Sequence, residues 1–201
     1  MGPGGDRAGS GGAVGTAARS ISGNRAQRSR FSGRCFGSHP VVARRPLSWD
    51  AFTGDAFYLD TNTLIFAVEQ GNPWTATLQE LFAAIDARRI HALTSELTMA
   101  EVLAKPLALG AVDLIERYEA LLAPDSLIRT VPVDRPVLRI AAELQGKLRI
   151  KLADAIHVAT AKQCACDFVL TNDERLGNRL GTEIRWLSLA EAVDAPGKTR
   201  D

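Results

Sequence analysis

Cysteine is scarce in this 201-residue chain, and its pattern excludes a disulfide scaffold. The three cysteines, Cys35, Cys164 and Cys166, are odd in number, which favours free thiols in a reducing cytoplasm. A Cys-x-Cys pair can contribute to a zinc site, but such sites use four nitrogen or sulfur ligands, and the sequence has no second cluster. We therefore expect buried free thiols at a helix end.

Long apolar runs are also missing. No stretch approaches the roughly 18 residues that a membrane-spanning helix needs. The N-terminal segment has no apolar stretch of the kind that forms the centre of a secretory signal. The sequence thus predicts a cytoplasmic protein that does not enter a membrane.

Core-forming residues are nearly absent from the first 50 positions, which contain one leucine and one isoleucine. Residues 1–50 carry eight arginines and two aspartates, a net charge of +6, whereas residues 51–201 carry 16 basic and 21 acidic side chains, a net charge of −5. Such a segment cannot bury enough apolar surface to offset the entropy of ordering it, so we expect a disordered leader over 1–50 and one folded domain over 51–201. A functionless tail or an overextended start is the favoured interpretation of this leader. An organelle transit peptide and an RNA-binding basic arm remain open.

The spacing of apolar residues in the rest of the chain predicts alternating strands and helices. Short apolar runs predict strands over 56–59, 90–94, 127–131, 168–170 and 184–187. Apolar residues three and four positions apart predict helices after Pro73, through Glu101 and ending before Pro106, over 111–122, over 137–148, from Asp154 to about Cys164, and after Ser188. This alternation is typical of an α/β fold around a mainly parallel sheet.

Two aspartates directly follow predicted strands. Asp60 ends the first apolar run, and Asp173 follows the fourth after Thr171 and Asn172. Ligands of an open parallel sheet gather beyond the carboxyl ends of its strands, so both acids are candidates for a binding site. Aspartate is also a preferred helix N-cap, which is the more ordinary explanation of either residue taken alone.

Two further acids lie on apolar helical stretches. Asp154 is surrounded by small and apolar neighbours, and an ionised carboxylate on a largely buried helix needs a partner such as a metal ion. Glu101 lies on a similar stretch, whereas Glu96 is better explained as a helix-start charge. His157 shares the helix of Asp154, where a lone histidine is usually a packing residue.

Convergence of these acids would suit a hard divalent cation. Mg²⁺ prefers oxygen ligands, keeps several waters and often bridges carboxylates to substrate phosphates. Two such ions can activate an attacking water and stabilise the leaving oxygen of a phosphodiester. Without a metal ion the carboxylates would repel one another, and some would take up protons.

Four segments that contain these acids resemble the motifs of PIN-domain nucleases, in the family's order and spacing. They are Tyr58–Ile65, Ser95–Glu101, Lys151–Ala161 and Leu170–Asp173, and the resemblance covers residues 56–194. It is closest to the VapC-type toxins of toxin–antitoxin pairs. The basic leader departs from the pattern of these toxins, and the second motif matches least well.

The resemblance implies a three-layer α/β/α sandwich and an endoribonuclease that cleaves single-stranded RNA with Mg²⁺ or Mn²⁺. By the same resemblance, the metal ligands or metal-orienting acids are Asp60, Glu101, Asp154 and Asp173, and Thr171 or Asn62 would contact metal-bound water or the scissile phosphate. It also implies a homodimer and a small antitoxin protein whose basic or aromatic residue blocks the acidic pocket.

Two other functions compete with this one. An aspartyl-phosphate phosphatase also places an acid after a first strand, but it usually has a second aspartate two residues later, where this chain has Asn62. A non-catalytic PIN-like module that binds RNA or protein would be expected to have lost an acid. RNA binding also needs cations near the acids, and the candidates for a phosphate track are Arg88, Arg89, Lys147, Arg149, Lys151, Arg175 and Arg179.

Overall fold

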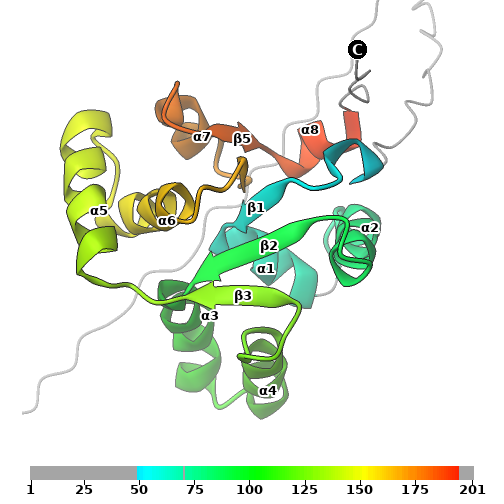
Figure 1. The fold of residues 1–201 in the computed structure, drawn as a ribbon. Helices are drawn as coiled ribbons and strands as arrows, with labels where there is room; N and C mark the ends of the chain where they lie inside the picture. The colour runs from blue at the N-terminus through cyan, green and yellow to red at the C-terminus, as the bar shows by residue number, and fades with distance from the viewer. Residues whose placement is uncertain (1–48, 70, 195–201) are drawn as a thin grey trace, which may run out of the picture. The chain divides into compact units, whose positions relative to one another are not determined.

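A computed structural model describes residues 49–69 and 71–194 (Figure 1). The expected leader lies outside these residues except for its last two positions, which begin η1 (Trp49–Phe52), a single turn of 3-10 helix. The Trp49 ring is only 3% exposed and lies 5.9 Å from the Phe52 ring and 5.8 Å from the Phe57 ring, between centroids. The folded unit therefore includes at least two residues that composition assigns to the leader.

The five strands form one parallel sheet in the order β3-β2-β1-β4-β5. Their bounds are β1 (Ala56–Leu59), β2 (His91–Ser95), β3 (Ile128–Val131), β4 (Phe168–Leu170) and β5 (Arg185–Leu187). The prediction of a mainly parallel α/β fold is confirmed, and each predicted strand lies within one residue of its observed bounds.

The order of the strands creates a switch point between β1 and β4. The chain enters the sheet at β1, proceeds through β2 to β3 at one edge, and then returns to place β4 on the other side of β1. β1 is the central strand of the sheet, between β2 and β4 (Figure 1). In open parallel sheets a crevice forms beyond the carboxyl ends of the two strands at such a point, so this topology positions a ligand site there.

Helices cover both faces of the sheet, as the α/β/α prediction requires. Alternate residues of β1 face opposite layers: Phe57 and Leu59 pack on one side, and Tyr58 packs on the other. The first side contains α1 (Thr61–Val68), α2 (Thr75–Asp86), α3 (Glu96–Leu109), α4 (Val112–Leu121) and α8 (Leu189–Asp194), and the second contains α5 (Arg135–Leu148), α6 (Leu152–Gln163) and α7 (Glu174–Leu180).

Helix α3 corrects one expectation. It does not end before Pro106 but runs to Leu109, and Pro106 is buried within it. A proline this close to the end of a helix removes one backbone hydrogen bond from the last turns but does not end the helix. The helix ends instead at Gly110, whose φ of 65° is the left-handed conformation that closes helices and that glycine adopts without strain.

Two short helices, α1 and α7, are absent from the sequence-based expectations. Each begins at a candidate catalytic acid: Asp60 accepts a hydrogen bond from the backbone N–H of Thr61, and Asp173 accepts from those of Arg175 and Leu176. Of the helices formed by the described residues, none is both long enough and apolar enough to cross a membrane.

Candidate active site

Asp60 and Asp173 lie at the switch point and are linked by one buried threonine. The Thr171 hydroxyl donates to Asp60 Oδ2 at 2.7 Å and accepts from the backbone N–H of Asp173 at 3.1 Å. The other oxygen of Asp60, Oδ1, accepts from the backbone N–H of Thr61 at 2.8 Å. Asp60 is 7% exposed and Thr171 is fully buried, so the ends of β1 and β4 are fixed relative to each other through this carboxylate.

Asp154 joins these two acids from the first turn of α6. Burial raises the pKa of its carboxyl group, the negative charges of Asp60 and Asp173 raise it further, and the charge and backbone N–H of Lys151 oppose the rise. The three aspartates are therefore close enough to interact electrostatically, although they come from three separate parts of the chain.

Glu101 reaches the same region from α3, but its carboxylate has its own partners. Its Oε2 accepts a hydrogen bond from the Thr61 hydroxyl and lies 2.8 Å from Nε2 of His157. Burial alone would raise the pKa of Glu101, but the bonds from His157 and Thr61 and the charge interaction with His157 lower it overall. Thr61 therefore connects Glu101 to Asp60, its neighbour in the chain.

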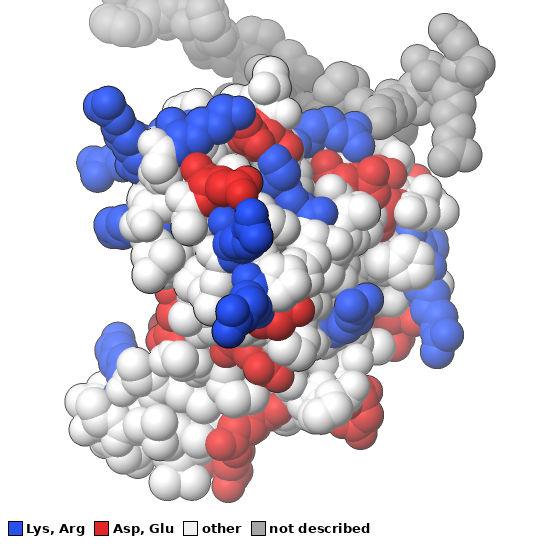
Figure 2. All heavy atoms as spheres, turned by 60° about the vertical axis from the view of Figure 1, so that its left-hand side comes forward, with Lys and Arg blue, Asp and Glu red and all other residues white. Residues whose placement is uncertain are grey.

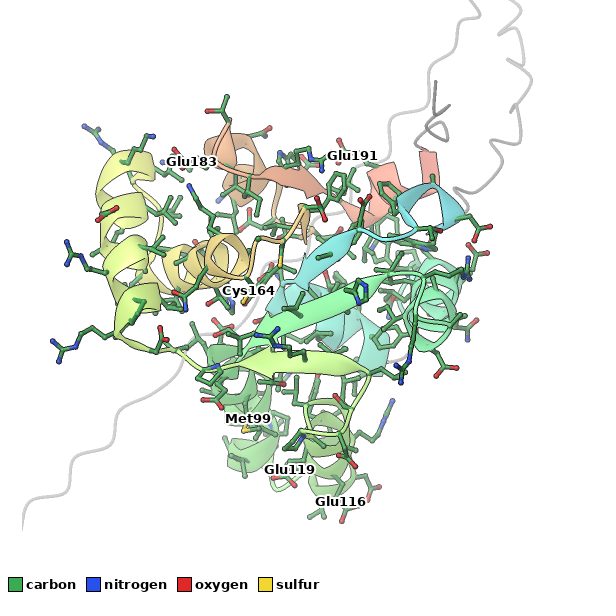
Figure 3. All side chains as sticks on the ribbon, in the orientation of Figure 1. Met99, Glu116, Glu119, Cys164, Glu183 and Glu191 are labelled. Carbon is green, nitrogen blue, oxygen red and sulfur yellow. The ribbon has the colours of Figure 1, made fainter. Side chains whose placement is uncertain are left out.

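Other candidates from the sequence occupy different positions. Asn62 is exposed on the first turn of α1, and Glu96 is exposed at the first residue of α3, as a helix-start charge would be. His157 is 3% exposed, and both ring nitrogens lie within hydrogen-bond distance of a polar side chain. Its partners are 56 and 99 residues away along the chain, which no local sequence pattern could reveal. Cys164 and Cys166 are free, as expected, but only Cys166 is buried, whereas Cys164, at the end of α6 (Figure 3), is partly exposed.

The donors around Asp60 suit a hard cation that keeps part of its hydration shell. Carboxylate and hydroxyl oxygens predominate, and Mg²⁺ in proteins is commonly held by one or two carboxylates and by water. Within the described ranges, no three Asp, Glu, His or Cys side chains are grouped so closely that all would ligate a single ion directly. The residues thus fit a hydrated divalent cation better than a fully protein-ligated one.

A cleft of about 450 Å³ opens beside Asp154 and Asp173 and is lined by basic side chains. The four cations that line it are Arg149, Lys151, Arg175 and Arg179. Arg179 donates to the backbone carbonyls of Leu148 and Arg149 at 3.1 Å each, which ties α7 to the end of α5. Among the described residues, the other three cations form no ion pair.

The other cations proposed for a phosphate track are not available in this cleft. Lys147 pairs with Glu183, which Figure 3 labels beside α7, and Arg89 pairs with Asp50. Arg88 lines a separate cleft near the first residues of β1 and β2. On the face of the molecule that Figure 2 shows, Lys and Arg side chains lie over the upper and central part, and mainly uncharged and acidic residues lie below.

Comparison with known protein families identifies the fold. A sequence model of the PIN domain matches residues 57–179, which include the four acids and the strands β1 to β4 except for Ala56. This chain belongs to the PIN domain family. The matched segment runs from β1 into α7 and has Asp60 and Asp173 near its two ends.

Solved PIN-domain structures share the fold at low sequence identity. FitAcB from Neisseria gonorrhoeae is 23% identical and covers 67% of this chain and 98% of its own, with a TM-score of 0.52. DNA-bound VapBC from Salmonella typhimurium is 18% identical, with coverages of 67% and 98% and a TM-score of 0.54. VapC20 from Mycobacterium tuberculosis, described as a sarcin–ricin loop cleaving toxin, is 15% identical, with coverages of 64% and 98% and a TM-score of 0.52. A search of curated protein sequences finds no match.

Proposed function

We propose that this protein is a metal-dependent endoribonuclease that hydrolyses phosphodiester bonds of single-stranded RNA. The observation that carries the proposal is the junction at the switch point, where Thr171 links Asp60 to Asp173 and both charges raise the pKa of Asp154. In a nuclease, carboxylates that are held close together are best explained by a bound cation that neutralises their charge. Perturbed carboxyl groups of this kind are also common at catalytic sites.

In this proposal Asp60, Glu101, Asp154 and Asp173 hold Mg²⁺ or Mn²⁺, directly or through its water. When bound, the cation lowers the pKa of water and stabilises the charge that develops on the phosphate. Thr171 orients Asp60 by donating to Oδ2, and its buried position excludes water from that bond. Asn62, exposed at the start of α1, is a candidate contact for the substrate rather than for the metal.

The basic cleft supports a polyanionic substrate. Arg149, Lys151 and Arg175 line the cleft beside Asp154 and Asp173, and none of them forms a close ion pair among the described residues, so they are candidates for contacts with phosphates. RNA is favoured over other polyanions because VapC20, which shares the fold, is a toxin that cleaves the sarcin–ricin loop. A strand that lies in this cleft would bring its phosphates next to the acids.

The proposal includes protein partners and a cytoplasmic location. A toxin of this kind would act on cytoplasmic RNA, form a homodimer and be inhibited by a small antitoxin. Exposed apolar side chains on α3 and at the start of α4 support a protein-binding surface: Met99, Leu107, Leu109 and Val112. Toxicity on expression alone, relieved by co-expression of a neighbouring short reading frame, is the expected result. A harmless product would argue against the toxin role.

A non-catalytic PIN-like module that binds RNA or protein is the second candidate. It is favoured by one observation, that within the described residues no three candidate ligands form a compact metal-binding group. Such a module would bind RNA through the basic cleft and leave it intact.

A cleavage assay separates the two candidates. Purified protein should cut a labelled single-stranded RNA with Mg²⁺ or Mn²⁺ and stop when EDTA is added. Asp60→Asn, Asp154→Asn and Asp173→Asn should each lower the rate at least about 100-fold. Because asparagine caps helices as well as aspartate does, losses at Asp60 and Asp173 would report the missing charge rather than a lost cap.

Glu174→Gln is the matched control, since this exposed acid is adjacent to Asp173 and should be dispensable. If two of the three asparagine variants kept their activity after contaminating nuclease had been excluded, the proposed site would be wrong. Binding of RNA without cleavage by the parent protein would support the non-catalytic module instead.

A further inference from the structure

A buried chain of hydrogen bonds leads from the sheet to Glu101. Tyr58, on β1, is fully buried, and its hydroxyl lies 2.6 Å from Nδ1 of His157. On the opposite side of the ring, Nε2 lies 2.8 Å from Oε2 of Glu101. His157 occupies α6 one turn after Asp154, so the ring lies between the core of the sheet and the candidate active site.

Chemistry fixes the direction of the hydrogen bond to Glu101. A carboxylate has no proton to donate and can only accept hydrogen bonds. Nε2 of His157 must then carry the proton and donate to Glu101. The opposite ring nitrogen, Nδ1, shares a hydrogen bond with the Tyr58 hydroxyl, and the direction of that bond depends on the tautomer of the ring. Burial raises the pKa of Tyr58 well above its ordinary value, so the phenol keeps its proton.

These contacts leave the two oxygens of Glu101 in different situations. Oε2 accepts from both His157 and Thr61, whereas Oε1 has no hydrogen bond to another described residue. The Glu101 side chain is 32% exposed, while the His157 side chain that holds it is 3% exposed. The carboxylate is therefore held from the buried side.

We infer that His157, oriented by Tyr58, is a positioning residue that holds Oε2 of Glu101 and leaves Oε1 as the oxygen offered to a divalent cation. The inference rests on the proposed function, because it assigns a role to residues beneath that same site. Partners that hydrogen-bond a ligating carboxylate restrict its rotation, and their loss commonly weakens metal binding about 10–100-fold.

Packing alone does not explain this arrangement. The neighbours Ile156, Val158 and Ala159 are apolar and buried, so an aliphatic side chain at position 157 would suit the same surroundings. Burying a phenol and an imidazole in such a place is unfavourable unless every polar atom has a partner. Here the phenol and the ring satisfy each other, and the chain ends on the carboxylate of a candidate ligand.

The test is calorimetric titration of Mn²⁺ into the full chain and three variants, with melting temperatures measured in EDTA. His157→Leu removes both hydrogen bonds and should weaken Mn²⁺ binding about 10–100-fold. His157→Gln keeps an amide donor near the position of Nε2 and should bind Mn²⁺ nearly as well as the parent. Tyr58→Phe keeps the shape of the ring, removes only the phenolic hydroxyl, and should give a smaller loss of affinity.

A double-mutant cycle isolates the role of Glu101. In a Glu101→Gln background, adding His157→Leu should cause no further loss of Mn²⁺ affinity, because the side chain that His157 positions has already lost its charge. A lower melting temperature for His157→Leu with unchanged Mn²⁺ affinity would show a packing role and overturn the inference. So would a loss of affinity that is equally large in the Glu101→Gln background.

Failure of the inference can be distinguished from failure of the proposed function. If the parent binds Mn²⁺ and neither His157→Leu nor Tyr58→Phe alters the affinity, only the positioning role is wrong. If the parent binds no Mn²⁺ at all, both are wrong. Should His157→Leu fail to fold, Tyr58→Phe still decides, because it leaves the packing of the ring unchanged.

Discussion

Replacing Thr171 with valine removes one hydroxyl group and keeps the branched shape of the side chain. The hydroxyl donates to Asp60 Oδ2 at 2.7 Å and accepts from the backbone N–H of Asp173 at 3.1 Å. Thr171→Val therefore breaks the link between two candidate ligands without opening a cavity. Thr63→Val is the matched control, because Thr63 is equally buried but donates to the backbone carbonyl of Leu170 at 3.1 Å.

The two substitutions differ in the charge of the acceptor. Loss of a hydrogen bond to a charged group costs about 1.5–3 kcal/mol, and loss of one between neutral groups costs about 0.5–1.5 kcal/mol. In a domain of this size, 1 kcal/mol shifts the melting temperature by about 2–4 °C. We expect decreases of roughly 3–12 °C for Thr171→Val and roughly 1–6 °C for Thr63→Val, both measured in EDTA.

Metal binding separates the two variants more clearly than stability does. Thr171→Val should weaken Mn²⁺ binding about 10–100-fold, since Asp60 is no longer oriented. Thr63→Val should bind Mn²⁺ like the parent, because its acceptor is a strand carbonyl. Thermal melts and calorimetric titrations of the three proteins make the comparison. Equal Mn²⁺ affinities for the two variants would refute the reasoning that Thr171 orients a ligand.

Three further predictions concern charge and the domain boundary. Because the raised pKa of Asp154 means that the folded state holds the proton more tightly, the metal-free parent should lose stability as pH rises from about 4 through that raised value. Asp154→Asn should remove this loss and melt no lower than the parent at pH 7 in EDTA, and a drop of several degrees would mark Asp154 as a structural cap. Arg149→Ala and Lys151→Ala should each weaken RNA binding and flatten its dependence on salt, measured by titration at several salt concentrations, and an unchanged slope would place the RNA elsewhere. Deleting 1–48 should leave the melting temperature within about 2 °C, whereas Trp49→Ala should cost about 3–5 kcal/mol; similar effects of the two changes would show that the boundary is wrong.

Local patterns were sufficient to predict the strands. The apolar runs over 56–59 and 168–170 coincide with β1 and β4, because both strands are buried on two faces and read as continuous apolar segments. Helix ends were harder to predict. Pro106 predicts an end to α3, but the helix ends at Gly110. A proline is tolerated in the last turns of a helix, and the left-handed conformation of Gly110 closes it.

The contacts within the site could not be predicted from local patterns. The sequence predicts that Asp60 and Asp173 follow strands, and the parallel sheet brings both to the carboxyl ends of its strands. It did not reveal the bonds of His157, since its partners Tyr58 and Glu101 come from other elements and only packing brings the three together. Likewise, only the folded structure shows that Lys147 is paired with Glu183.

That Asp60, Asp154 and Asp173 act together on one divalent cation is tested most directly by calorimetric titration of Mn²⁺ into the parent and the three asparagine variants. We expect the parent to bind Mn²⁺, each variant to lose at least about tenfold in affinity, and the control Glu174→Gln to bind like the parent. No binding by the parent, or equal binding by the parent and all three variants, would contradict a shared metal site.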